Sequence, residues 1–184
     1  ELPGVLLPAV TPGGAFRAGR PPLLPPDLDA LPCPYAARLL DPVDEDVVLV
    51  ETTRGCPYRC GFCAYPMGRA RVVRRADQRI LWAIANARAR DVREVYVLDP
   101  SFDAHPALDA LLDAIAAANP PPRRRLFAEL RAETVTPSRA QRLANAGFAE
   151  VELGLQAVSA ATRRTMGRTG RLRDFVAGAR ALRE

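Results

Sequence analysis

Hydrophobic positions change from an irregular distribution to an alternation of two regular patterns near residue 47. Short runs rich in valine and leucine predict strands over residues 47–52, 94–98, 126–133 and 150–156. Elsewhere, apolar side chains recur every three or four residues, which predicts helices over residues 76–90, 105–118, 137–146, 159–165 and 172–184. A regular alternation of strand and helix predicts parallel strands joined by helical crossovers.

The predicted fold class is therefore α/β, with about four strand-helix units that form part of a parallel barrel or an open sheet. In both architectures, reactive groups gather at the carboxyl ends of the strands. The unusual polar residues of this chain follow the predicted strands in that way: three cysteines after the first, Asp99, Ser101 and Asp103 after the second, Arg131 and Glu133 at the end of the third, and Gln156 at the end of the fourth. We expect them to share one edge of the sheet.

Residues 1–46 form a proline-rich leader ahead of a core domain over residues 47–184. Ten of the 18 prolines fall at or before Pro42, and no sustained period is visible there, which indicates an irregular segment. The chain begins at Glu1 without a methionine and stops where a fifth strand would begin. We expect it to be a piece of a longer protein with an incomplete barrel.

Composition indicates a globular protein outside the membrane. The chain has 184 residues, of which 48% are hydrophobic and 26% charged, and no run approaches the roughly 20 apolar residues of a membrane span. Without a signal-peptide pattern, the expected location is the cytoplasm. The net charge is +5, and all 26 basic residues are arginine. Positive charge that comes from arginine alone is explained better by a biased amino-acid composition than by nucleic-acid binding, although nucleic-acid binding stays open.

Three cysteines, Cys56, Cys60 and Cys63, are spaced by four and three residues, so that one loop can gather all three thiols. A structural zinc site needs a fourth ligand, for which Cys33 and His105 are the candidates. Three thiolates on one loop suit instead a four-iron cluster in which one iron has no protein ligand. An arginine-rich, zinc-stabilised module that binds nucleic acid is the alternative function.

The pattern Cys-x-x-x-Cys-x-aromatic-Cys, formed here by the three cysteines and Phe62, resembles the signature of the radical S-adenosylmethionine (SAM) superfamily. The resemblance implies a partial parallel (βα) barrel, a 4Fe-4S cluster on the three cysteines, and SAM bound to the open iron. It further implies an enzyme that reductively cleaves SAM to a 5′-deoxyadenosyl radical, which abstracts hydrogen from a substrate. A reductant such as a ferredoxin or flavodoxin would supply the electron.

The resemblance also implies roles for four residues in holding SAM. By analogy Phe62 lies near the adenine, Gln156 binds the ribose hydroxyls, Arg168 binds the methionine carboxylate, and Glu129 helps to hold the cofactor. These roles agree with the hydrogen-bonding capacity of each side chain. Structural readings remain for three of them: Gln156 as a helix cap, Arg168 as a surface arginine, and Glu129 as an ion-pair partner of Arg131 or Arg124.

One part of the chain departs from the family pattern. Its second strand is followed by residues 98–103, Leu-Asp-Pro-Ser-Phe-Asp, where the family often has a Gly-Gly-Glu run that receives the amino group of SAM. Backbone carbonyls or Asp99 could take over that contact, or the segment could be a turn without a ligand role. The chain also stops where a fifth strand would begin, so a truncated, inactive member of the family is a further alternative.

The leader points to one branch of the superfamily. Residues 27–35, together with residues 51–55 before the first cysteine, are similar to the connector that follows a cobalamin-binding domain. The resemblance implies a cobalamin-dependent methyltransferase-type reaction, with cobalamin held by a domain outside this chain. The identity of the substrate does not follow from these residues.

Overall fold

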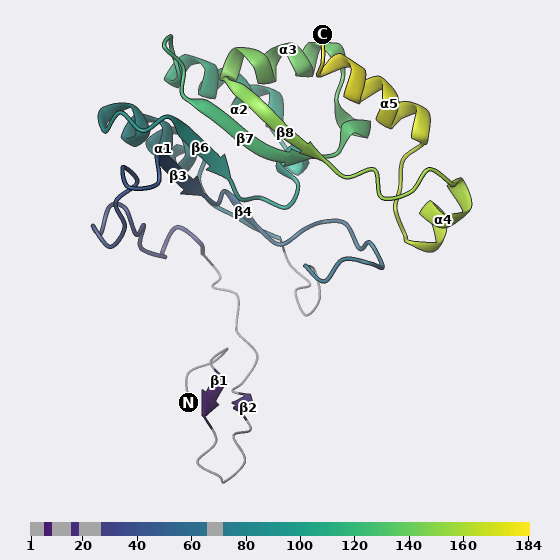
Figure 1. Cartoon of the computed structure of the whole chain (residues 1–184), viewed down its shortest axis with the longest axis horizontal. Coiled ribbons are helices and arrows are strands. Elements are labelled where there is room, and N and C mark those ends of the chain that lie inside the picture. The colour runs from purple at the N-terminus through teal and green to yellow at the C-terminus, as the bar shows by residue number, and fades with distance from the viewer. Residues whose placement is uncertain (1–5, 9–15, 19–26, 66–71) are drawn as a thin grey trace.

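A computed structural model of the chain describes residues 6–8, 16–18, 27–65 and 72–184 (Figure 1). Its centre is a four-stranded sheet in the order β3-β6-β7-β8, made of β3 (Val47–Val50), β6 (Glu94–Val97), β7 (Arg125–Leu130) and β8 (Phe148–Leu153). All three strand pairs are parallel. The predicted α/β fold is confirmed, and the sheet agrees with a partial (βα) barrel.

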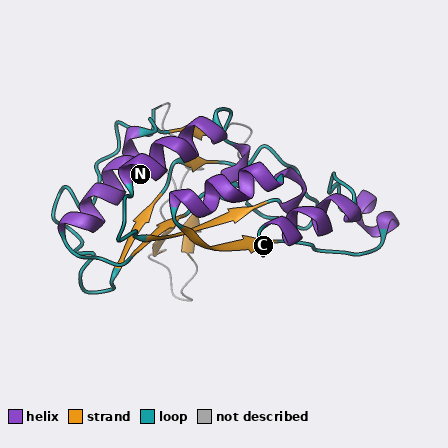
Figure 2. Cartoon of the chain, turned by 90° about the horizontal axis from the view of Figure 1, so that it is seen from above, coloured by secondary structure: helices purple, strands orange, loops and turns teal. Residues whose placement is uncertain are grey.

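Helices cover one face of this sheet (Figure 2). They are α1 (Gln78–Ala89), α2 (Leu108–Ala118) and α3 (Pro137–Ala146), whose apolar sides meet alternate residues of the strands in one core. Val48, Val95 and Ile84 are completely buried there. Side chains between the core positions point to the opposite face, where Leu49 and Glu129 are exposed. The fold therefore leaves one side of the sheet open for a site.

Two further helices follow β8: α4 (Ala160–Thr165) and α5 (Leu172–Ala181). Helix α5 packs against the short 3₁₀ helix η2 (Ala132–Thr134), which directly follows β7. Gly178 makes this packing possible, because a Cβ atom there would lie 1.9 Å from the carbonyl oxygen of Ala132. The segment between α4 and α5 is thereby held near the end of β7.

Element boundaries differ from prediction at several places. The predicted third strand ends at Leu130, because the backbone turns there into η2. The fourth strand begins at Phe148, directly after the left-handed Gly147 that ends α3 (φ 99°), and it stops at Leu153. The predicted helix 105–118 begins at Leu108, after the 3₁₀ helix η1 (Phe102–Ala104).

A small antiparallel pair beyond the first strand was not expected from the sequence. Strands β4 (Thr53–Arg54) and β5 (Val73–Arg74) flank the segment that contains the cysteines. Each strand has only two residues, too few to show a period of two. The pair closes the base of the cysteine-containing segment and fixes where that segment leaves the sheet.

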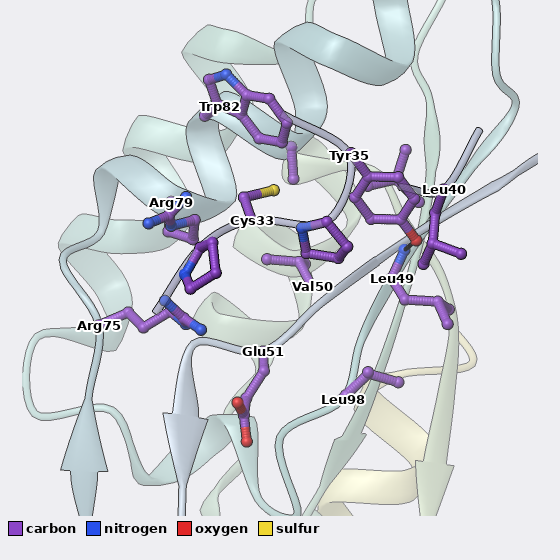
Figure 3. A pocket seen from close by; sticks show the side chains of 14 residues that line it. Cys33, Tyr35, Leu40, Leu49, Val50, Glu51, Arg75, Arg79, Trp82 and Leu98 are labelled. Carbon is purple, nitrogen blue, oxygen red and sulfur yellow. Dashed lines mark hydrogen bonds between the residues drawn. The ribbon is translucent and has the colours of Figure 1, made fainter. Parts of the chain in front are cut away.

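Part of the predicted leader packs on the edge of β3. The Tyr35 hydroxyl accepts a hydrogen bond from the Leu49 N–H at 2.9 Å (Figure 3). Arg75 donates to the carbonyl oxygen of Leu28. A cavity of 280 Å³ lies between this segment and the sheet, lined by Cys33, Trp82 and other residues. The short strands β1 (Leu6–Pro8) and β2 (Phe16–Ala18) pair with each other, whereas most of residues 1–26 lie outside the described part.

In the part of the chain that the structure describes, no helix is long and apolar enough to cross a bilayer.

Candidate functional site

The three cysteines of the predicted motif line one cavity at the carboxyl ends of the strands. Cys56, Cys60 and Cys63 are free, half-buried thiols, and the cavity has a volume of 150 Å³. Gly55 just before them adopts a left-handed conformation (φ 98°), which a residue without Cβ takes at little cost. The turn directs the chain from β4 into the cysteine loop, residues 56–63.

The thiols of the loop influence one another electrostatically. Burial raises the pKa of the Cys56 thiol, and the charges of Cys63 and Cys60 raise it further, although a backbone hydrogen bond and the nearby Arg131 oppose this. Three thiolates in one cavity therefore repel each other unless a positive centre lies between them. A metal centre provides that charge, because it binds the thiolate form.

Three cysteine thiols contribute to the lining of this cavity, and a set of three thiolates suits a four-iron cluster with one open iron. Among the described residues, no group of three His, Cys, Asp or Glu side chains is arranged to hold a metal ion. Neither candidate for a fourth zinc ligand lines this cavity: Cys33 lines the other cavity, and the His105 ring is hydrogen-bonded to Asp77 at 3.1 Å.

The cysteine loop rests on the segment after α4. The Gly61 N–H donates to the carbonyl oxygen of Met166 at 2.8 Å, and a Cβ on Gly167 would lie 3.2 Å from the carbonyl oxygen of Arg59. This contact brings Arg168 into the lining of the cysteine cavity. Its side chain is only 7% exposed, so Arg168 is not a solvated surface arginine.

One buried carboxylate holds the arginines on this side of the site. Glu133 Oε1 accepts from Arg163 Nη2 at 2.8 Å and lies 3.7 Å from Arg131 Nη2, and Glu133 Oε2 lies 3.7 Å from Arg168 Nη2. Gly170 leaves room for the Glu133 side chain, since a Cβ there would lie 2.9 Å from Glu133 Cγ. Three buried guanidinium groups thus share the single carboxylate of Glu133, so this cluster has more positive than negative charge.

Arg131 connects this charge cluster with the cysteine loop. Its guanidinium lies over the ring of Tyr58 at 4.1 Å from the centroid, and its Nη2 donates to the carbonyl oxygen of Thr169 at 2.5 Å. Its backbone N–H donates to the buried carboxylate of Asp103. Sequence reasoning placed Arg131 and Glu133 at a strand end but gave them no role. Their spacing by two after an apolar run was the available signal.

Two carboxylates contribute to the same lining as the arginines. Glu129 of β7 and Glu152 of β8 are register partners, and both line the cysteine cavity. Among the described residues neither has a hydrogen bond or an ion pair, so the alternative pairing of Glu129 with Arg131 or Arg124 is not found. Burial and the charge of Glu152 raise the pKa of Glu129. Such a pair favours a cationic group between the two carboxylates.

Gln156 and Phe62 complete the lining of this cavity. Gln156 lies three residues beyond the end of β8 with a left-handed backbone (φ 69°), and its side chain turns back over Gly154, where a Cβ would lie 2.5 Å from Gln156 Nε2. It does not cap the next helix, because Ser159 does so by accepting from the Thr162 N–H. Phe62 is 47% exposed at the rim.

The Asp99 carboxylate is buried and already hydrogen-bonded within the protein. Its carboxylate accepts hydrogen bonds from the N–H groups of Thr52 and Thr53 at 2.7 and 2.9 Å and from the Thr52 hydroxyl. Burial raises its pKa, although these hydrogen bonds oppose the shift. Asp99 therefore joins the ends of β3 and β6 and is not free to receive an amino group.

Comparison with known proteins agrees with this geometry. A family model described as "Radical SAM superfamily" matches residues 50–184. The structure resembles the cobalamin- and [4Fe-4S]-bound radical SAM methyltransferase TsrM from Kitasatospora setae (TM-score 0.66, 22% identity, 74% of this chain and 28% of that one). It also resembles the cobalamin-dependent SAM radical enzyme OxsB with aqua-cobalamin and SAM bound (TM-score 0.67, 16% identity, 95% of this chain and 27% of that one). The chain spans little more than a quarter of these proteins. No curated protein matches it.

Proposed function

The chain belongs to the radical SAM superfamily, and from this premise we propose that its cysteine cavity holds a 4Fe-4S cluster and SAM. One observation carries the proposal: residues distant in the sequence, the three cysteines, Glu129, Gln156 and Arg168, line the same cavity. The three thiols would ligate the cluster and leave one iron open to the cofactor.

Each remaining side chain has a part of the cofactor that it suits. Arg168 would bind the methionine carboxylate, because its buried guanidinium donates no hydrogen bond within the described part of the chain. Glu129, with Glu152 beside it, would receive the amino group, a task for which Asp99 is not free. Gln156 would accept from the ribose hydroxyls, and Phe62 would lie along the adenine.

We propose that the protein is an enzyme that acts through a radical. The cluster and SAM, when bound, would supply one-electron cleavage of the sulfonium, which gives methionine and a 5′-deoxyadenosyl radical for hydrogen abstraction. The residues of this chain would bind and orient the cofactor, with Arg168 and Glu129 holding the two ends of its amino acid part. The electron would come from a reductant protein such as a ferredoxin or flavodoxin, in the cytoplasm.

The solved structures support a narrower proposal. TsrM and OxsB are both described as containing cobalamin, and they resemble this chain over most of its length. We propose that a domain outside the chain supplies cobalamin, that residues 1–46 connect it to the core over residues 47–184, and that the reaction is of the methyltransferase type. The zinc-stabilised nucleic-acid module is less well supported, since neither Cys33 nor His105 lines the cysteine cavity.

Cofactor cleavage tests the proposal. The chain is reconstituted anaerobically with iron and sulfide, reduced with dithionite, and incubated with SAM, and 5′-deoxyadenosine and methionine are measured by liquid chromatography. Equal amounts of both products are expected, and a Cys60→Ala variant should form neither. Cleavage that continues unchanged in the variant would contradict the assignment of the thiols.

A further inference from the structure

A second cavity lies beside the cysteine cavity and is lined by residues of α4, of the segment after it and of the beginning of α5. Its volume is 230 Å³, and it is lined by Val158, Ala160, Arg163, Arg164, Arg168, Gly170, Arg171 and Leu172. We call it the arginine cavity. Four of its eight lining residues are arginines and none is acidic. Arg168 is the residue that the two cavities share.

The positive charge around the arginine cavity exceeds the negative charge available to it. Glu133 is shared among Arg131, Arg163 and Arg168. Asp174 receives a hydrogen bond from Arg171 at 2.9 Å. Arg164 has no partner within the described part of the chain. The buried Nε atoms of Arg163 and Arg168 also find no acceptor there.

Backbone geometry adds to this charge. Helix α5 begins at Leu172 in the cavity lining, and no side chain caps its first N–H groups. The amino end of a helix carries partial positive charge and attracts anions. The helix end and the guanidinium groups therefore act in the same direction.

We propose that the arginine cavity binds an oxyanion of the phosphate type, carried by a larger ligand. Guanidinium groups bind phosphate oxygens in a forked arrangement, and the two side chains at the rim, Arg164 and Arg171, are exposed and able to close on it. One water molecule needs about 10–15 Å³ of cavity volume. The 230 Å³ of the arginine cavity therefore accommodate a polyatomic anion together with atoms of the group that carries it. This site is distinct from the proposed place of the SAM carboxylate, and the two would be neighbours through Arg168.

Titration with inorganic phosphate tests the proposal. Isothermal calorimetry at low ionic strength should show saturable binding of one phosphate by the whole chain. Arg164→Ala should weaken it about tenfold, because one charge-assisted contact is lost. Arg180→Ala is the matched control, since Arg180 is an exposed arginine of α5 outside the cavity. Its phosphate affinity should equal that of the unchanged chain.

A second titration separates phosphate binding by the arginine cavity from phosphate binding by the proposed cluster. Phosphate can bind to iron, so the titration is repeated with Cys60→Ala, in which the proposed cluster cannot form. Unchanged phosphate binding in Cys60→Ala, together with about tenfold weaker binding in Arg164→Ala, would support the arginine cavity. No saturable binding, equal weakening by Arg164→Ala and Arg180→Ala, or loss of binding in Cys60→Ala would overturn it, whatever the fate of the proposed function.

Discussion

The backbone N–H of Gly61 donates a hydrogen bond to the carbonyl oxygen of Met166 at 2.8 Å. This bond joins the middle of the cysteine loop to the segment that follows α4, two residues before Arg168. The thiols and the arginine thereby belong to one assembly, although the connecting chain runs through three strands of the sheet. The thiols lie on one side of this contact and Arg168 on the other. We therefore expect mutations of Cys60 and of Arg168 to separate cluster ligation from SAM binding.

Cys60→Ala should abolish cluster formation, since two thiolates do not hold four irons in the proposed way. Iron and sulfide content after anaerobic reconstitution measures the loss. Cys33→Ala is the matched control, because Cys33 lies in the other cavity beside Trp82. It should retain the iron content of the unchanged chain, and a parallel loss in Cys33→Ala would show that the assignment of ligands is wrong.

Arg168→Ala should weaken SAM binding and leave cluster assembly intact. A charge-assisted contact contributes about 1.5–3 kcal/mol, which corresponds to at least about a tenfold change in the dissociation constant. Equilibrium dialysis with labelled SAM on the reconstituted protein measures this affinity. Arg180→Ala again serves as control. Equal SAM affinity in the Arg168 variant and the control would remove Arg168 from the cofactor site.

SAM affinity should fall as the pH is lowered from about 8 toward the raised pKa of the Glu129 carboxyl. Burial and the charge of Glu152 raise the pKa of Glu129, so this carboxylate takes up its proton at a higher pH than an ordinary glutamate, whose pKa is about 4.3. The protonated form no longer attracts the amino group of SAM. Glu129→Gln should bind SAM more weakly at pH 8 and with a flatter pH profile. A profile as steep as that of the unchanged chain would assign the effect to another group.

Gly178→Ala should lower the free energy of unfolding by about 2 kcal/mol, because the added methyl group meets the carbonyl oxygen of Ala132 and forces α5 away from η2. Urea unfolding followed by circular dichroism measures the change. Ala177→Ser, at the exposed neighbouring position of the same helix, should cost about 0.5 kcal/mol. Unchanged or increased stability of Gly178→Ala would mean that α5 does not pack on η2 as described.

The spacing of hydrophobic residues was sufficient to predict the core strands and helices, because each of these elements buries the side on which its hydrophobic residues recur. Helix α3 has the predicted bounds, 137–146: Thr136 caps its beginning by accepting from the Arg139 N–H, and Gly147 ends it in a left-handed conformation. Strands β4 and β5 could not be predicted, because two residues carry no period and their pairing depends on a distant segment.

The resemblance to the radical SAM superfamily implied that the cysteines, Gln156 and Arg168 belong to one site. The structure brings them into one lining, and their roles stay predictions. The roles of Arg131 and Glu133 could not be predicted, because they arise from packing of the α4–α5 segment against the end of β7. A local sequence pattern does not show that three arginines converge on one carboxylate. The same holds for Asp99, whose engagement by Thr52 and Thr53 depends on the neighbouring strand.

Electron paramagnetic resonance on the reconstituted, reduced chain, with and without SAM, tests the central claim most directly. We predict the signal of a reduced four-iron cluster whose shape changes when SAM is added, because the open iron binds the cofactor. The change should be absent or need more SAM in Arg168→Ala, with the cofactor-free signal preserved. A cluster signal that is indifferent to SAM, or zinc in place of iron, would contradict the account.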